Sequence, residues 1–221
     1  MTTLPFAYET DLCAVLARHL GELFEQSAQE RHSCTLRERA VGEVIPDFVY
    51  VHADRSALSG RVRELTSLEA SLVAALLPGR PLRANTIARR LYCQTERVDH
   101  RLRALERTGV LTSGGRGAFS LRSEESFASA HVVAVEAKLR RWREAVRQAE
   151  SYLRFANRSY VALPWAVIEG NRALASAAKK ARVGIISVEE ERATLTLDAP
   201  VVPTRSADWV WLLSRTIGLP V

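Results

Sequence analysis

The run from His131 to Leu139, HVVAVEAKL, constrains the fold most strongly. It is apolar on both of its faces until two opposite charges, Glu136 and Lys138, interrupt it. This pattern predicts a central strand of a sheet, because a strand with one solvated face alternates apolar and polar residues. Side chains alternate across a strand, so Glu136 and Lys138 are expected on the same face.

Strand and helix patterns surround this run. Apolar residues at helical spacing predict helices at Tyr8–Gln29, Arg140–Asn157 and Asn171–Arg182, with a short one at Ser206–Ile217. Alternation predicts a strand at Cys34–Ala40, and β-rich runs predict strands at Val44–His52, Ser159–Leu163, Val183–Val188 and Ala193–Asp198. Their order predicts an α/β domain, with a mixed sheet flanked by helices.

Positive charge is concentrated in one segment. Residues 61–122 hold twelve arginines, no lysine and five acidic residues, a formal charge of +7, whereas the rest of the chain carries −1. Such local basicity favours a polyanion-binding module within a near-neutral scaffold. We therefore predict an inserted domain at 61–124 and a discontinuous α/β domain formed by 1–60 and 125–221.

The inserted segment has three helical patterns and a hairpin pattern. The helices are expected at Leu65–Leu77, at Arg83–Tyr92, and from Thr95 as N-cap to a stop at Gly109. LERTGVL, followed by a turn rich in glycine and arginine, resembles the recognition helix and wing of winged helix-turn-helix modules. The resemblance implies DNA contacts by Arg89, Arg90, Thr95, Arg97, His100, Arg101 and Arg116. Protein contacts, or arginines that only solvate a helix, are the alternatives.

An acidic residue on another predicted strand, Asp47, supplies a second carboxylate. If its strand lies beside the run at 131–139, then Asp47, Glu136 and Lys138 converge. Two carboxylates and the backbone carbonyl between them suit a hard divalent cation such as Mg²⁺, for which Mn²⁺ can substitute. The lysine amine can orient a water, help to deprotonate it, or offset the charge of a phosphate. These groups suit hydrolysis of a phosphodiester.

Three motifs in chain order carry a family resemblance. IPDFVYV, VVAVEAK and RQAESY resemble the Asp, Glu-x-Lys and QxxxY motifs of the PD-(D/E)XK nuclease superfamily. The resemblance implies a restriction-endonuclease-like fold, with Asp47 and Glu136 as metal ligands and Lys138 as the catalytic lysine. Gln148 and Tyr152 would support the site. An additional carboxylate on the first helix is assigned to Glu22, with Glu25 and Glu43 as alternatives.

The leading function is therefore a Mg²⁺-dependent DNA endonuclease, with double-stranded DNA positioned by a winged helix. The alternatives are a non-catalytic DNA-binding regulator and, more distantly, RNA cleavage. A homodimer or an accessory protein is compatible with either. The sequence contains no run of about 18 apolar residues, so no membrane-spanning helix is predicted. The three scattered cysteines favour reduced thiols in a cytoplasmic protein.

Overall fold

The structure is a computed structural model that describes residues 5–24, 31–54, 64–122, 127 and 129–216. The chain divides into two compact units. The first, here called the sheet unit, comprises 1–29, 33–50 and 131–204. The second, called the arginine-rich unit, comprises 30–32, 51–130 and 205–221.

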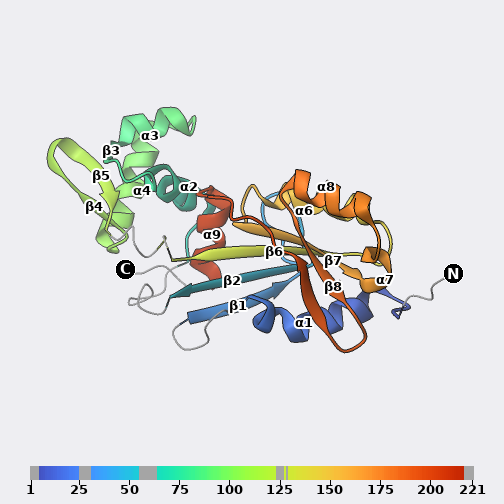
Figure 1. Cartoon of the computed structure of the whole chain (residues 1–221). Helices are drawn as coiled ribbons and strands as arrows, with labels where there is room; N and C mark the ends of the chain where they lie inside the picture. Colours follow the sequence, from blue (N-terminus) through green and yellow to red (C-terminus); the bar gives the residue numbers. More distant parts are fainter. Residues whose placement is uncertain (1–4, 25–30, 55–63, 123–126, 128, 217–221) are drawn as a thin grey trace. The chain divides into compact units, whose positions relative to one another are not determined.

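A mixed six-stranded sheet forms the framework of the sheet unit (Figure 1). Its order is β1 (Arg31–Arg37), β2 (Phe48–Asp54), β6 (His131–Ala137), β7 (Arg158–Pro164), β8 (Gly184–Val188) and β9 (Ala193–Leu197). Strands β6, β7 and β8 are parallel, and β9 is antiparallel to β8. The prediction of an α/β domain with β6 as a buried inner strand is confirmed.

Helices cover both faces of this sheet. Helix α1 (Glu9–Phe24) packs on one face, where its apolar side chains meet Val133 and Val135 of β6. Helices α6 (Trp142–Tyr152) and α8 (Arg172–Ala181) pack on the other face, against Val161 and Leu163 of β7. The alternation of side chains along each strand separates these two cores. A four-residue helix, α7 (Trp165–Ile168), follows β7 and was not predicted.

The arginine-rich unit combines helices with a small antiparallel sheet. Its elements are α2 (Ser67–Leu76), β3 (Leu82–Arg83), α3 (Ala84–Arg90), α4 (Thr95–Arg107), β4 (Leu111–Ser113), β5 (Ala118–Leu121) and α9 (Ala207–Thr216). A single 3₁₀ turn, Gly115–Gly117, joins β4 to β5, and the strands lie in the order β3-β5-β4. Thr66 and Glu69 form a capping box that fixes the start of α2.

Two features of this unit differ from the sequence predictions. Gln94 is the N-cap of α4 and Thr95 is its first helical residue, so the predicted cap was wrong by one position. Helix α9 packs against α2, and the backbone N–H of Leu65 donates to Ser214 Oγ at 3.2 Å. Residues 205–216 therefore group with the arginine-rich unit, whereas the sequence had assigned them to the α/β domain. The predicted boundaries at 60/61 and 124/125 lie outside the described residues.

The structure bears on two further expectations. Cys13, Cys34 and Cys93 are all free thiols. Among the described residues, no helix has the length and apolar character needed to cross a membrane.

Gly184 gives a test of the packing between β7 and β8. A Cβ atom there would lie 2.3 Å from Cδ1 of Tyr160 and 2.7 Å from the carbonyl oxygen of Leu197. Gly184→Ala is therefore expected to lower the free energy of unfolding by about 1–3 kcal/mol. Thermal denaturation should show a Tm lower by about 2–4 °C for each kcal/mol. Gly115→Ala is the matched control, because its Cβ would meet nothing within 4 Å; equal melting of the two variants would contradict this packing.

Candidate active site

Ala137, the last residue of β6, follows Glu136 in the chain and binds Asp47, the other acidic residue predicted at the site. Its backbone N–H donates to Asp47 Oδ2 at 2.7 Å across 90 residues of sequence. Asp47 lies directly before β2, the neighbour of β6 in the sheet, and not within the strand as predicted. Its second oxygen, Oδ1, accepts no hydrogen bond from any described residue. Asp47 is thus held in place through one oxygen and keeps the other available.

Glu136 is buried and has a partner on each carboxylate oxygen. Its Oε1 lies 2.9 Å from Lys138 Nζ, and its Oε2 accepts a hydrogen bond from the Tyr152 hydroxyl at 2.5 Å. Lys138 Nζ also donates to the Ala137 carbonyl at 3.2 Å. The structure therefore brings together Asp47, Glu136, Lys138 and Tyr152, as the sequence predicted.

The carboxylate that α1 contributes is Glu9 and not Glu22. Glu9 Oε2 lies 3.5 Å from Lys138 Nζ. Glu22 is thirteen residues further along the same helix, about 20 Å along its axis, and its side chain is 79% exposed and pairs with His19. The assignment of Glu22 as a metal ligand is therefore not supported by its position. The amphipathic pattern of α1 gives no indication of which helix end faces the site.

Of the two alternatives to Glu22, the structure describes only Glu43. The Glu43 side chain is 94% exposed and lies 4.0 Å from Arg154. Glu25 lies outside the described residues.

Gln148 lies one helical turn before Tyr152 on α6. Its side-chain oxygen is buried, yet it accepts no hydrogen bond within the described part of the chain. A buried amide oxygen without a donor costs free energy, so a water or a ligand is expected to supply one. Its side-chain oxygen is thus free to accept a hydrogen bond, and the supporting role of Gln148 stays a prediction.

Burial and mutual repulsion shape the protonation of this cluster. Desolvation raises the pKa of Asp47 and of Glu136, and the nearby charge of Asp47 raises that of Glu136 further. Burial lowers the pKa of Lys138, but its hydrogen bond to Glu136 and the charges of Glu136, Asp47 and Glu9 outweigh this effect and raise it overall. Burial and the hydrogen bond to Glu136 also raise the pKa of Tyr152. Lys138 therefore stays an ammonium and Tyr152 a neutral donor at physiological pH.

The donor set fits a hard divalent cation in its chemistry. Asp47 Oδ1, the Glu136 carboxylate and the Ala137 carbonyl are oxygen donors, which Mg²⁺ and Mn²⁺ prefer. With all three acids ionised, Glu9, Asp47, Glu136 and Lys138 carry a formal charge of −2, which an added cation would offset. No three His, Cys, Asp or Glu side chains within the described ranges are grouped to hold a metal ion. A cation here would therefore rest on two carboxylates and a backbone oxygen.

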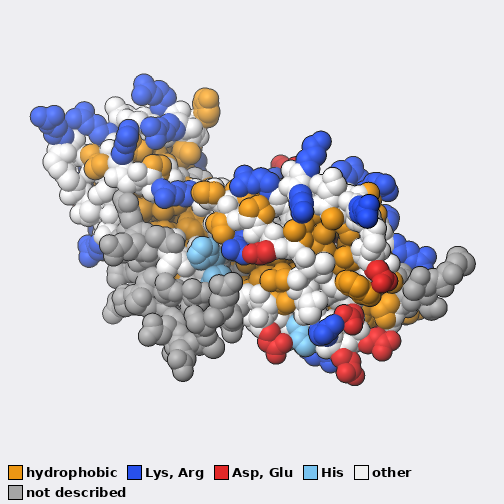
Figure 2. Space-filling model, viewed as in Figure 1, with side chains coloured by type: hydrophobic (Ala, Val, Ile, Leu, Met, Phe, Trp, Pro, Cys, Tyr) orange, Lys and Arg blue, Asp and Glu red, His pale blue; other side chains and the backbone are white. Residues whose placement is uncertain are grey.

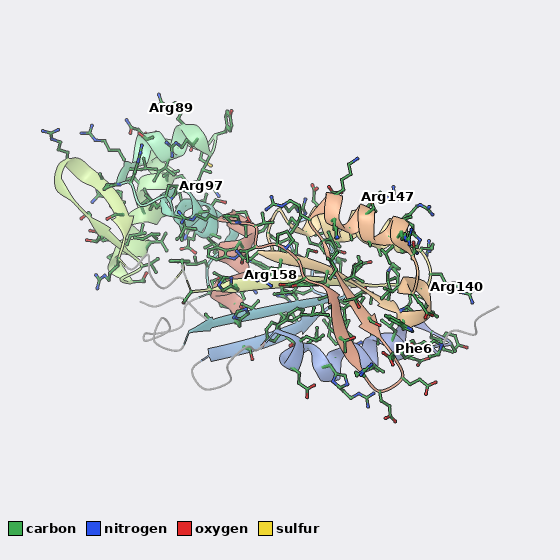
Figure 3. All side chains as sticks on the ribbon, viewed as in Figure 1. Phe6, Arg89, Arg97, Arg140, Arg147 and Arg158 are labelled. Carbon is green, nitrogen blue, oxygen red and sulfur yellow. The ribbon has the colours of Figure 1, made fainter. Side chains whose placement is uncertain are left out.

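The residues predicted to contact DNA share one property, exposure to solvent. They are Arg89, Arg90, Thr95, Arg97, His100, Arg101 and Arg116. Figure 2 shows basic side chains, all arginines in this segment, gathered over α3, α4 and the β4–β5 hairpin, and Arg89 and Arg97 extend from α3 and α4 in Figure 3. The five arginines of this set form no ion pair with any described residue, whereas Arg103 pairs with Asp99 at 2.7 Å. Their charges are thus available to a polyanion.

The sheet unit has a groove with basic side chains in its lining. It lies between α6 and α8, has a volume of about 480 Å³, and includes Trp142, Arg143, Arg147 and Lys180 among its lining residues. The Arg143 guanidinium lies over the Trp142 ring, 4.3 Å from its centroid. Only the packing of two helices creates this groove, so no single sequence motif could have predicted it.

Comparisons with known proteins add little to this geometry. No protein-family model matches the chain, and neither does any curated protein. One solved structure, described as the SPO1766 protein of unknown function from Silicibacter pomeroyi, is similar at 18% identity with a TM-score of 0.30. The match covers 39% of this chain and 55% of that one.

The raised pKa of Asp47 makes a prediction about stability and pH. A carboxyl whose pKa is higher in the folded protein than in the unfolded chain stabilises the fold below its unfolded pKa. That contribution is lost as the pH rises through the folded pKa. Asp47→Asn, which can still accept the Ala137 N–H, is therefore expected to raise Tm at neutral pH in metal-free buffer. The gain should shrink as the pH falls through the carboxyl range.

Differential scanning calorimetry from acid to neutral pH measures this effect. Glu43→Gln, at an exposed position, is the control and should leave Tm unchanged. Added Mg²⁺ or Mn²⁺ should stabilise the wild type more than Asp47→Asn, because the variant lacks a charged ligand. A lower Tm for Asp47→Asn at neutral pH would show that the ionised carboxylate stabilises the fold.

Proposed function

We propose that this protein is a metal-dependent DNA endonuclease of the PD-(D/E)XK type. In this proposal the sheet unit is a restriction-endonuclease-like domain that cuts. Within the arginine-rich unit, the segment predicted at 61–124 is an inserted winged helix-turn-helix module that binds duplex DNA, and α9 packs against its helix α2. The observation that carries the proposal is the convergence of Asp47, Glu136 and Lys138 around the backbone of Ala137.

Each group at the site has a role consistent with hydrolysis of a phosphodiester. A divalent cation, held by Asp47, Glu136 and the Ala137 carbonyl, would polarise the phosphate as a Lewis acid. Lys138 is suited to offset phosphate charge and to orient a water through its N–H groups. Because the pKa of Lys138 is raised, this role is favoured over that of a general base. Tyr152 fixes the orientation of Glu136, and Glu9 does the same for Lys138.

The arginine-rich unit supports the DNA-binding half of the proposal. Its order of helix, short strand, two helices and hairpin, with strands in the order β3-β5-β4, suits a winged helix. Val98, Leu102 and Leu105 of α4 are buried, which directs Arg97 and Arg101 to the solvent. Arg116, with a φ of 65°, lies at the tip of the hairpin.

One observation favours the second candidate, a DNA-binding regulator that does not cut. Both oxygens of Glu136 already have partners, Lys138 and Tyr152, so this carboxylate is satisfied without a metal. An ion pair between Glu136 and Lys138 would then serve only to hold the end of β6. Cleavage measurements separate the two candidates.

The test of catalysis is incubation of the pure protein with supercoiled plasmid in Mg²⁺, Mn²⁺ or EDTA. The wild type is expected to nick DNA only with the metal. Lys138→Ala should reduce the rate by about 10²–10³-fold, because one group that stabilises developing charge is removed. Glu9→Gln should reduce it by about 10–100-fold, as expected for a residue that positions another site group.

Glu22→Gln is the matched control for Glu9→Gln, since both acids lie on α1 and only Glu9 contacts Lys138. Wild-type rates in Glu22→Gln are expected. Wild-type cleavage by Lys138→Ala would remove the catalytic assignment, and no cleavage of any DNA by the wild type would favour the regulator.

The test of DNA binding is the dependence of affinity on salt. Removing one cationic side chain that binds a phosphate should flatten the slope of log K against log salt by about 0.9 for duplex DNA. Replacing Arg97, Arg101 and Arg116 together with alanine should therefore reduce the slope by about 2–3. Fluorescence anisotropy titrations at several salt concentrations in EDTA measure it. The control is the triple variant Arg18, Arg172 and Arg192 to alanine, three exposed arginines of the sheet unit; an equal change in both variants would contradict a dedicated DNA-binding surface.

A further inference from the structure

Tyr92, between α3 and α4, is an aromatic side chain without packing. It is 98% exposed, the largest exposure among the large hydrophobic residues that the structure describes. Its backbone is in the left-handed region, with a φ of 53°. Both properties are unfavourable for tyrosine, since bulky residues rarely adopt positive φ and an exposed ring gains nothing from burial.

The local backbone explains the conformation but not the residue type. Leu91 is the C-cap of helix α3, and the N–H of Cys93 donates to the carbonyl of Ala88 at 2.9 Å. This bond is typical of a helix end whose next residue is left-handed, a position that glycine fills most often. Neither the backbone nor any core therefore favours a tyrosine at position 92, and the ring is available for a ligand.

Cationic side chains flank Tyr92 in the chain. Arg89 and Arg90 occupy the last turn of α3, and Arg97 lies in the first turn of α4. All three are exposed and belong to the surface proposed above to bind phosphates; Arg89 and Arg97 are labelled in Figure 3. Proteins bind unpaired nucleotides by combining exposed aromatic rings, on which bases stack, with cationic side chains that hold the phosphates.

Stacking requires a base with a free face, which limits the kinds of DNA structure that the Tyr92 ring can bind. In a continuous duplex the two faces of each base are covered by its neighbours, so an external ring finds no free face. A free face exists only where a base is unpaired or where paired DNA ends. We propose that Tyr92 stacks on such a base, so that the arginine-rich unit prefers junctions between single-stranded and double-stranded DNA. This inference rests on the DNA binding proposed above.

The experiment compares two duplexes with identical ends, one fully paired and one with a central unpaired segment. Each carries the fluorescent base 2-aminopurine at the same position, which borders the unpaired segment in the second. Anisotropy in EDTA gives affinity without cleavage, and 2-aminopurine fluorescence reports stacking. The wild type is expected to bind the second duplex at least about fivefold more tightly, the lower range for one stacked base, and to change its fluorescence.

Three variants of Tyr92 and one control test whether the aromatic ring itself causes the preference for the duplex with an unpaired segment. Tyr92→Phe keeps the ring and should keep the preference, whereas Tyr92→Leu should lose both the preference and the fluorescence change. Tyr92→Leu should retain the wild-type affinity for the fully paired duplex. Tyr92→Gly should also lose the preference while melting about 2–4 °C higher, because glycine relieves the positive φ. Tyr8→Leu, at a tyrosine 70% exposed in the sheet unit, should change nothing.

The outcomes distinguish this inference from the proposed function. Tight binding of both duplexes with equal affinity would overturn the role of Tyr92 and leave the DNA-binding proposal in place. Loss of the preference in Tyr92→Phe would place the interaction on the hydroxyl and overturn stacking. Absence of binding to either duplex would overturn both proposals.

Discussion

The hydrogen bond from the Ala137 amide to Asp47 is the interaction on which the candidate site depends. It joins the end of an inner strand to a residue 90 positions away, on the segment that leads into the neighbouring strand. Because Ala137 lies between Glu136 and Lys138, this one bond fixes where both of those side chains stand relative to Asp47. The backbone carbonyl of Ala137 accepts a hydrogen bond from Lys138. The peptide groups of this one residue therefore help to position three charged side chains.

Electrostatic repulsion among the acidic side chains around Lys138 is unfavourable for the stability of the fold. Two carboxylates with raised pKa values share a mostly desolvated space, and a third acid reaches the same lysine. One ammonium cannot balance three ionised acids. Sites that keep like charges together are commonly functional, because a ligand completes the charge balance that the protein alone lacks.

Much of the sheet unit could be predicted, because its strands are long apolar runs and its helices have strong periodicity. The motif residues also converge as expected, since strand alternation fixes the relation of Glu136 to Lys138. The failures have local causes. The two-residue strand β3 and the four-residue helix α7 are too short to give a periodic signal. Glu9 was missed because periodicity reveals the buried side of a helix, and not the end that approaches a site.

The position of α9 has a consequence for how this chain folds during synthesis. The arginine-rich unit joins α2 to a helix that follows every strand of the sheet in sequence. All described elements that group with the sheet unit are made by residue 204. The arginine-rich unit begins earlier in the chain than most of that sheet, yet α9, the helix that packs against α2, is made after the sheet. During synthesis on the ribosome, the side of α2 that packs against α9 therefore stays uncovered until the intervening strands and helices have been made.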